Sequence, residues 1–132
     1  MNYWLVKSEP FKYSWKKFLS EKETIWDGVR NYQARNHLRN MKLGDLVLFY
    51  HSNEGKEVIG IAKVSKEFYQ DPTSSDQNWV AVNLIPFEEF KNPVSLEQIK
   101  NEPMLKQISL VRQGRLSVMA LNKIEFDKIL EM

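Results

Sequence analysis

One short apolar run, Leu46–Ser52, constrains the fold of this 132-residue chain more than any other segment. Its residues are nearly all apolar, which is typical of a strand buried in a core. The turn-forming sequence Asn53-Glu54-Gly55-Lys56 follows directly, and a second strand-like segment then runs from Glu57 to about Tyr69. This pattern predicts a β-hairpin in the middle of the chain.

Further elements are predicted on both sides of the hairpin. Alternating apolar residues indicate strands at Tyr3–Lys7 and Trp79–Phe90. Capping residues, hydrophobic staples and one apolar stripe indicate helices. These helices are expected at Ser14–Leu19, Asn31–Met41, Ser95–Lys100 and Asn122–Leu130. Gly60, inside the second strand of the hairpin, predicts a bulge or a close backbone approach.

The order of these segments predicts an α+β domain. Strands joined by hairpins, with helices inserted after the first strand and at the end, favour a small curved antiparallel sheet that is nearly closed into a barrel. A chain of this length is expected to form one domain, residues 1–132. It can bury about two-thirds of its unfolded surface, so it needs no covalent cross-link to fold.

Composition excludes several classes of protein. The chain has no cysteine, which rules out a disulfide scaffold, a thiolate metal cluster and a cysteine nucleophile. Its two histidines are too few for a multi-histidine metal site. No phosphate-binding or dinucleotide-binding glycine motif is present. We therefore expect neither a metal nor a cofactor.

The location is predicted from what the sequence lacks. The longest apolar runs are too short to cross a membrane, and Met1-Asn2-Tyr3-Trp4 does not resemble the start of a signal peptide. We expect a protein of the cell interior, cytoplasmic, or nuclear if the source is eukaryotic. It is expected to act as a monomer without contact with a membrane.

The arginines are unevenly distributed. The net charge is only +2, from 19 basic and 17 acidic residues, which argues against coating nucleic acid by bulk electrostatics. All five arginines lie in two short segments. They are Arg30, Arg35, Arg39, Arg112 and Arg115. Arginine suits bidentate recognition of phosphates and base edges, so the two clusters could frame one planar or anionic ligand. The alternative is ion pairing on helix surfaces.

The segment Trp26–Asn36 is polar in a way that secondary structure does not require. Its eleven residues supply two aromatic rings, two Arg, two Asn and one Gln. Aromatic faces stack on bases, amides pair with base edges and Arg binds phosphate. This combination predicts a pocket for an unstacked nucleobase. The alternative is that Asn31 only caps a helix and that Trp26 belongs to the core.

Two other polar segments leave alternatives open. His51 either bonds to a backbone partner or projects, with Ser52, into the same pocket as Trp26. Lys7, Ser8 and Glu9 could support catalysis, because a desolvated lysine beside a carboxylate can act as a base. Adjacent strand residues face opposite ways, however, so Lys7 and Glu9 would share a face without Ser8.

Four motifs, in order along nearly the whole chain, resemble those of the EVE domain family. They are Tyr3–Pro10, Trp26–Asn36, Gly44-Asp45 followed by Phe49–Ser52, and Arg115–Val118. The resemblance implies a PUA-like fold, in which a curved, barrel-like sheet is flanked by helices, and kinship with YTH and ASCH domains. It also implies a pocket that reads modified bases in DNA or RNA.

The resemblance places ten residues of this chain around such a pocket. They are Lys7, Ser8, Trp26, Asn31, Tyr32, Gln33, Arg35, His51, Ser52 and Arg115. Our main hypothesis is a binding module in which a flipped-out modified base stacks between Trp26 and Tyr32. The amides of Asn31 and Gln33 read its edge, together with the hydroxyls of Ser8 and Ser52. Arg35, Arg39 and Arg115 contact phosphates outside the pocket.

Two other functions are compatible with the same residues. Related ASCH proteins include small amidohydrolases that act on a modified nucleoside, and Lys7, Ser8 and Glu9 would be the catalytic candidates for such a reaction. The other is a protein-interaction domain, for which Trp26 and Arg35 would be irrelevant to nucleic acid.

Overall fold

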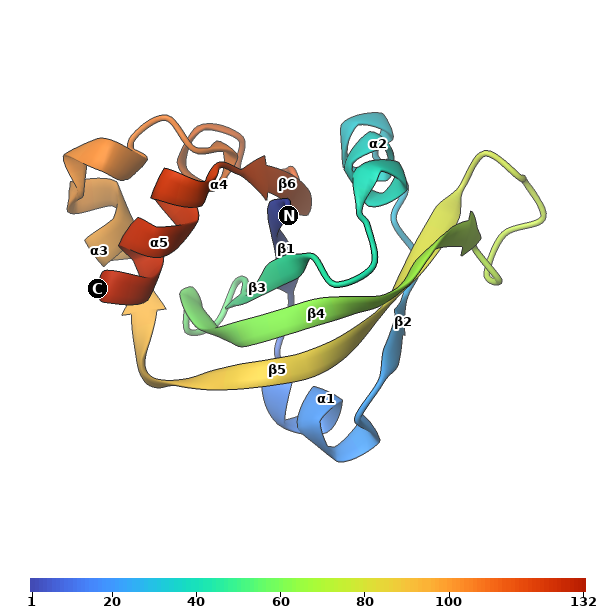
Figure 1. Ribbon diagram of the computed structural model, residues 1–132, viewed down its shortest axis with the longest axis horizontal. Coiled ribbons are helices and arrows are strands. Elements are labelled where there is room, and N and C mark those ends of the chain that lie inside the picture. Colours follow the sequence, from blue (N-terminus) through green and yellow to red (C-terminus); the bar gives the residue numbers. More distant parts are fainter.

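The computed structural model describes all 132 residues and contains one six-stranded sheet with helices on both sides (Figure 1). The strand order is β2-β5-β4-β3-β1-β6. The strands are β1 (Tyr3–Ser8), β2 (Thr24–Trp26), β3 (Leu46–His51), β4 (Glu57–Gln70), β5 (Val80–Ser95) and β6 (Val118–Leu121). The helices are α1 (Trp15–Glu21), α2 (Tyr32–Asn40), α3 (Leu96–Asn101), α4 (Ser109–Arg112) and α5 (Lys123–Glu131), with a 3₁₀ turn at Pro103–Leu105. None of the helices is both long and apolar enough to cross a membrane.

The predicted hairpin is the centre of the sheet. β3 pairs with β4 in antiparallel register, and β4 continues into a long antiparallel pair with β5. The register shifts between Phe49 and Tyr50 and at four places along β4 and β5. Such irregularities bend strands and increase their twist. The sheet is therefore strongly curved, as predicted, but it does not close into a barrel.

The pairing of β1 departs from the prediction. It lies antiparallel to β6 but parallel to β3, with Lys7 opposite Tyr50 and Ser8 opposite His51. Parallel neighbours need a long crossover connection, and residues 9–45, which contain α1, β2 and α2, supply it. The prediction of an antiparallel sheet is thus wrong for this one pair, because the order of elements alone does not show which strands become neighbours.

Helix α1 packs on the sheet through two aromatic side chains. The rings of Phe18 and Phe49 stack with centroids 5.5 Å apart, and Trp15 meets Phe49 edge-on at 5.3 Å. A Cβ on Gly60 would come within 2.8 Å of the Trp15 ring and 2.6 Å of the Glu88 carbonyl oxygen. The predicted close backbone approach at Gly60 is confirmed. In Figure 1, α1 lies below the long strands and the other helices lie above them.

The capping residues behave as expected. Ser95 with Gln98 and Asn122 with Glu125 form capping boxes at the starts of α3 and α5. Besides the 3₁₀ turn, three elements were not predicted, β2, β6 and α4. Each is only three or four residues long, too short to show a period of its own.

Candidate functional site

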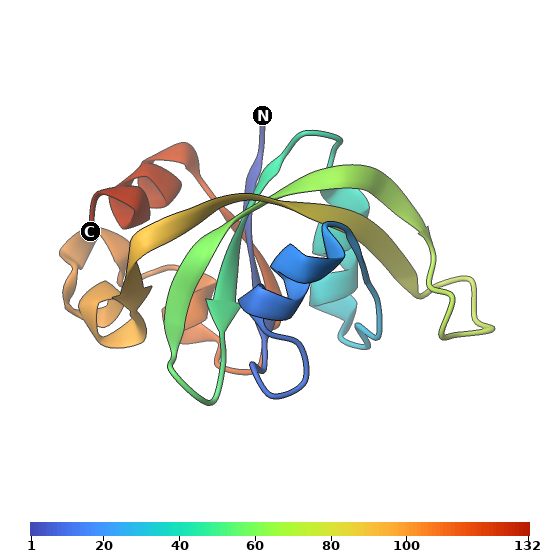
Figure 2. The ribbon, with the colours of Figure 1, turned by 90° about the horizontal axis from the view of Figure 1, so that it is seen from below.

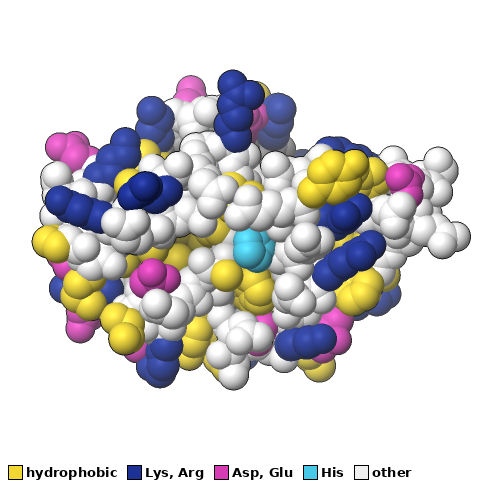
Figure 3. Space-filling view, turned by 90° about the horizontal axis from the view of Figure 1, so that it is seen from above, with side chains coloured by type: hydrophobic (Ala, Val, Ile, Leu, Met, Phe, Trp, Pro, Cys, Tyr) yellow, Lys and Arg dark blue, Asp and Glu magenta, His cyan; other side chains and the backbone are white.

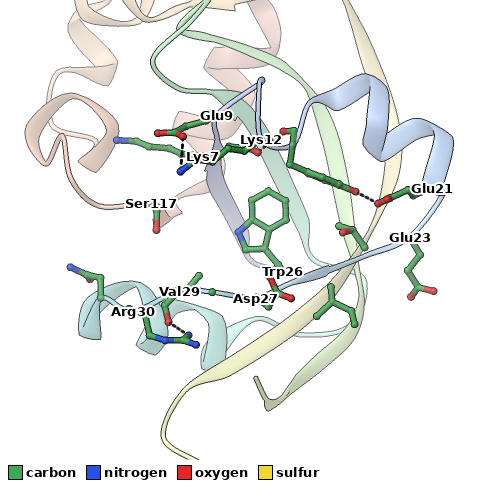
Figure 4. A pocket seen from close by; sticks show the side chains of 16 residues that line it. Lys7, Glu9, Lys12, Glu21, Glu23, Trp26, Asp27, Val29, Arg30 and Ser117 are labelled. Carbon is green, nitrogen blue, oxygen red and sulfur yellow. Dashed lines mark hydrogen bonds and ion pairs between the residues drawn. The ribbon is translucent and has the colours of Figure 1, made fainter. Parts of the chain in front are cut away.

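A cleft of about 1050 Å³ opens between the end of β1, the turn after α1, and the loop that joins β2 to α2 (Figure 4). Sixteen residues line it. They are Lys7, Ser8, Glu9, Lys12, Tyr13, Glu21, Glu23, Thr24, Ile25, Trp26, Asp27, Gly28, Val29, Arg30, Asn31 and Ser117. In Figure 2, the β1–α1 loop and the β2–α2 loop both extend towards the bottom of the view, so segments distant in sequence meet there.

Trp26 stands inside this cleft (Figure 4). Strand β2 positions it, because Trp26 pairs with Val82 of β5. The ring is half-buried and packs edge-on against Phe49 at 5.7 Å and Tyr13 at 6.3 Å. Its Nε1–H makes no hydrogen bond within the protein and lies on the ring edge towards Lys7 and Ser117. Trp26 thus belongs to both the core and the cleft wall.

A buried carboxylate holds the loop beyond Trp26 in place. Asp71 is fully buried and accepts hydrogen bonds from the Gly28 N–H at 2.8 Å, the Arg30 guanidinium at 2.9 Å and the Thr73 N–H at 2.7 Å. Burial alone would raise the pKa of Asp71, but the hydrogen bonds from Thr73, Arg30 and Gly28 lower that pKa to about 2. The carboxylate is therefore charged at neutral pH, and it ties the β2–α2 loop to the β4–β5 loop.

Asp27, in the same loop, lines the cleft. Burial, and then the charge of Asp71, raise the pKa of Asp27 above its ordinary value. Asp27 is the lining carboxylate that makes no hydrogen bond or ion pair, whereas Glu9, Glu21 and Glu23 are each bonded to other side chains. It is therefore the acceptor most available to a ligand.

Asn31 combines a structural contact with a free donor group. Its Oδ1 accepts the Ala34 N–H at 2.9 Å and caps α2, whose nine residues run from Tyr32 to Asn40. The Nδ2 of the same amide makes no hydrogen bond, and Asn31 lines the cleft. Both interpretations of this residue, as a helix cap and as a group facing the site, are thus compatible with the geometry.

Lys7, Ser8 and Glu9 line the cleft but do not bond to one another. The Lys7 Nζ donates to the Gly114 carbonyl at 3.0 Å, and burial lowers its pKa. The Ser8 hydroxyl donates to the Tyr13 carbonyl at 2.5 Å. Glu9 pairs with Lys12 at 3.1 Å and accepts from Asn53 at 2.6 Å. Lys7 thus forms a pair with neither Ser8 nor Glu9.

Three other predicted residues lie outside the cleft lining. His51 Nε2 accepts the Trp15 N–H at 3.1 Å, so the structure shows the backbone partner of the first alternative, and burial lowers the pKa of His51. Ser52 lines a smaller neighbouring cavity. Arg115 is exposed. In sequence it follows Gly114, which lines the smaller cavity, and lies two residues before Ser117, which lines the cleft.

The remaining predicted residues gather on a surface that we call the arginine–aromatic ledge. It consists of Arg30, Tyr32, Arg35, Arg39, Phe68 and Trp79. The rings of Tyr32 and Trp79 stack at 5.4 Å, and the Arg35 guanidinium lies 4.9 Å from the first and 5.1 Å from the second. Figure 3 shows basic side chains beside hydrophobic ones on this side of the face, over α2. Gln33 is exposed on the same helix.

Arg35 and Arg39 are fixed by one backbone oxygen. Both guanidinium groups donate to the Asn78 carbonyl, at 3.4 and 3.1 Å, and thereby join α2 to the β4–β5 loop. Arg30 connects the ledge to the cleft, because it lines the cleft and its guanidinium lies 5.6 Å from the Trp79 ring. Most of the predicted residues thus fall into two adjoining groups, the cleft and the ledge, rather than one pocket, and His51, Ser52 and Arg115 belong to neither group.

Sequence reasoning missed several residues of both groups. The sequence pattern places Trp79 at the start of a strand and Tyr13 just before the helix expected at Ser14–Leu19, and it marks neither as a site residue. Nothing local distinguishes a half-buried ring that faces a cleft from one that faces the core. Asp27 and Arg30 lie inside the segment singled out by its polarity, and Ser117 lies in the last motif, so a signal existed for these three.

An open, bent sheet with an aromatic-walled polar cleft at one end defines the class as a PUA-like domain. The YTH domain of Zygosaccharomyces rouxii MRB1 has a similar fold, with a TM-score of 0.62 and 16% identity over 98% of this chain and 84% of the other. The chain belongs to the EVE domain family, whose model matches residues 2–132. This finding confirms the predicted fold class and family.

Solved and curated relatives are similar over nearly the whole chain. The Agrobacterium tumefaciens protein Atu2648 has a TM-score of 0.97 and 44% identity, covering 100% of this chain and 92% of the other. Mouse thymocyte nuclear protein 1 is 38% identical over 99% of this chain and 73% of its own length. The human protein, solved in complex with DNA containing 5-methylcytosine, has a TM-score of 0.92 and 33% identity, covering 99% of this chain and 96% of the other.

Proposed function

We propose that the protein is a nucleic-acid-binding module that holds a modified base in the cleft. The observation that carries this proposal is the indole of Trp26, half-buried in a cleft of about 1050 Å³ with its N–H free of any partner in the protein. A flipped base needs a ring to stack on and polar groups at its edge. The human relative solved with 5-methylcytosine DNA supports the same function.

The free polar groups of the cleft would read the edge of the base. Trp26 Nε1 and Asn31 Nδ2 are donors, and the Asp27 carboxylate is an acceptor suited to an exocyclic amine. Ser8 contributes through position, since its hydroxyl holds the Tyr13 backbone. Tyr13, edge-on to Trp26, would stand beside the stacked base in the place that the sequence predicts for Tyr32.

The phosphates of the strand bind outside the cleft. Four carboxylates against three basic side chains line the cleft, so phosphate is not favoured inside it. The ledge offers the opposite character, with Tyr32 and Trp79 for a flanking base and Arg35 and Arg39 for phosphate. Gln33 would contact the strand from α2, and Arg115 from the side of Gly114. His51 acts indirectly, by holding the start of α1.

The binding free energy by which a pocket can distinguish a single methyl group is small. A pocket that fits one extra methyl group gains about 1–3 kcal/mol over the unmodified base. We expect the protein to bind DNA or RNA as a monomer in the cytoplasm, or in the nucleus of a eukaryote. Because few phosphates are contacted, affinity should fall with salt along a modest slope.

Fluorescence anisotropy on matched oligonucleotides tests the proposal. DNA and RNA strands carrying either 5-methylcytosine or cytosine at one position are compared at several salt concentrations. Wild type should prefer the modified strand, and Trp26→Ala should abolish that preference. Phe87→Ala, at an exposed ring on β5 outside the cleft lining, is the matched control. Equal affinity for modified and unmodified strands at every salt concentration, also with other common modifications, would overturn the proposal.

A further inference from the structure

A second cavity, of about 220 Å³, lies next to the cleft and has a different character. It is enclosed by the end of β1, the hairpin between β3 and β4, and helices α3 and α4. Figure 2 shows that hairpin extending to the same side of the molecule as the loop after β1. Lys7 lines both the cavity and the cleft, and so stands between them.

The charges of this cavity are all positive. Lys7, Lys56 and Lys100 line it, and no carboxylate does. Neither Lys56 nor Lys100 forms an ion pair or side-chain hydrogen bond in the protein. Lys7 uses one of its three N–H donors on the Gly114 carbonyl, which leaves two. Three ammonium groups around a hollow, without a counter-charge, favour an anionic ligand.

The floor of the cavity carries an unpaired hydroxyl. Tyr50 is only 3% exposed, and its hydroxyl makes no hydrogen bond in the protein. It lies in register with Lys7 on the neighbouring parallel strand, so the two side chains stand on the same face of the sheet. Burial raises the pKa of Tyr50, which keeps the hydroxyl protonated and available as a donor at neutral pH. Ser52 and Asn53 add further polar groups to the lining.

The backbone at the mouth of the cavity is held in an unusual conformation. Lys56 has a φ of 49°, in the left-handed region that lysine seldom adopts. Its carbonyl accepts the Leu96 N–H at 2.8 Å, which ties the hairpin to α3. Residues kept in such conformations cluster at binding sites, where the surrounding structure maintains them.

The size of the cavity fits a compact group. Cavities for drug-sized ligands begin at about 300 Å³, so this one is too small for a nucleoside and sufficient for a tetrahedral anion. Lysines and hydroxyl donors without acids are the groups that bind phosphate. We propose that this cavity binds a phosphoryl group, and that the group is a backbone phosphate of the strand whose base occupies the cleft. The second half of this proposal rests on the proposed function.

The shared lysine supports that assignment. Phosphate is not favoured in the acidic cleft, and Lys7 is the one side chain that the two hollows have in common. Figure 4 shows Lys7 and Arg30 on opposite walls of the cleft. A strand with its base against Trp26 would thus find basic groups on both sides, the ledge beyond Arg30 and the small cavity beyond Lys7. The strand is then held on both sides of the bound base.

The first experiment needs no nucleic acid. ¹⁵N-labelled protein is titrated with inorganic phosphate at constant ionic strength, against chloride as reference. Saturable amide shifts are expected in residues 50–56, 96–100 and 110–114. The double variant Lys56→Gln with Lys100→Gln, and separately Tyr50→Phe, should weaken phosphate binding about fivefold or more, the effect of losing one hydrogen bond to a charged group. Lys91→Gln, at an exposed lysine on β5, should not. Linear shifts, or equal affinity in the variants, would overturn the site.

The second experiment identifies the source of the phosphate. Modified oligonucleotides carry one neutral methylphosphonate linkage, either before or after the modified base. One of these should weaken wild-type binding about fivefold and have little effect on the Lys56→Gln/Lys100→Gln variant, which has already lost that contact. Equal losses in both proteins would refute the strand assignment and make the cavity a site for free phosphate. Failure of base discrimination leaves the phosphate titration unaffected, so the two proposals fail separately.

Discussion

The guanidinium of Arg30 donates a 2.9 Å hydrogen bond to the fully buried carboxylate of Asp71, 41 residues further along the chain. The same carboxylate accepts the Gly28 N–H. One acidic side chain therefore fixes the loop that forms a wall of the cleft, and it orients the arginine that connects the cleft to the ledge. The position of this cleft wall and of Arg30 therefore depends on Asp71, which does not itself line the cleft.

Replacing that acid should weaken the whole domain. In Asp71→Asn, the Arg30 guanidinium loses its partner charge and the donors of Gly28 and Thr73 compete for one amide oxygen. Removing one member of a buried charged network costs about 2–4 kcal/mol. Urea unfolding followed by tryptophan fluorescence measures the loss. As a control, Asp76→Asn changes an exposed acid in the same loop. If Asp71→Asn were as stable as wild type, the network would have no structural role.

The same carboxyl group predicts how stability depends on pH. The pKa of Asp71 falls from 3.8 to about 2 on folding. A lowered folded-state pKa means that its stabilisation is fully present above pH 3.8 and is lost as the pH falls towards 2. The difference in unfolding free energy between wild type and Asp71→Asn should stay constant between pH 7 and 5 and shrink below pH 4. A difference that did not change between pH 7 and pH 2.5 would contradict the prediction.

Gly60 should tolerate no side chain. A methyl group there meets the Trp15 ring and the Glu88 carbonyl oxygen at distances where atoms must move. Overpacking of this kind costs about 1–3 kcal/mol. Gly114→Ala is the matched control, because a Cβ at Gly114 has no atom within 4 Å, and we expect its stability to lie within about 0.5 kcal/mol of wild type. Thermal unfolding of both variants decides the matter. Equal melting temperatures for Gly60→Ala and wild type would show that α1 shifts freely.

The ledge should contribute affinity without selectivity. Arg35 is half-buried beside Tyr32 and Trp79 and does not line the cleft, so Arg35→Gln would remove a phosphate contact but no group of the cleft. Binding to modified and unmodified strands should weaken equally, and the slope of log affinity against log salt should fall by about one. Lys91→Gln removes the same charge from the far part of β5 and controls for net charge. A change in the ratio of the two affinities would instead place Arg35 at the base.

Local patterns predicted what depends on neighbours in sequence. The hairpin after Leu46–Ser52, the capping boxes of Ser95 and Asn122, and the close approach at Gly60 all have short-range signals, and the structure contains each of them. The parallel pairing of β1 with β3 has none, because it depends on how residues 9–45 fold back. Strand β2 is defined by its partner β5 rather than by its own three residues.

The candidate site shows the same division. The polarity of Trp26–Asn36 pointed to the loop of the cleft, which Trp26, Asp27 and Asn31 line. It did not separate Trp26, which faces the cleft, from Tyr32, which stacks on Trp79. The different positions of Trp26 and Tyr32 depend on contacts of this segment and of α2 with Asp71 and Asn78, both more than 35 residues away in sequence. No single-sequence pattern encodes such contacts.

Asn31 allows the two roles of one side chain to be separated. Serine caps helices about as well as asparagine, whereas alanine loses about 1 kcal/mol, so Asn31→Ser should keep the unfolding free energy of wild type and Asn31→Ala should not. Neither variant retains the amide Nδ2 that faces the cleft. We therefore expect both to bind the modified oligonucleotide about fivefold more weakly, the effect of one lost hydrogen bond. Chemical denaturation and anisotropy measured on the same samples separate the effects. Wild-type affinity in Asn31→Ser would mean that this residue serves α2 alone, and that Trp26 and Asp27 read the base without it.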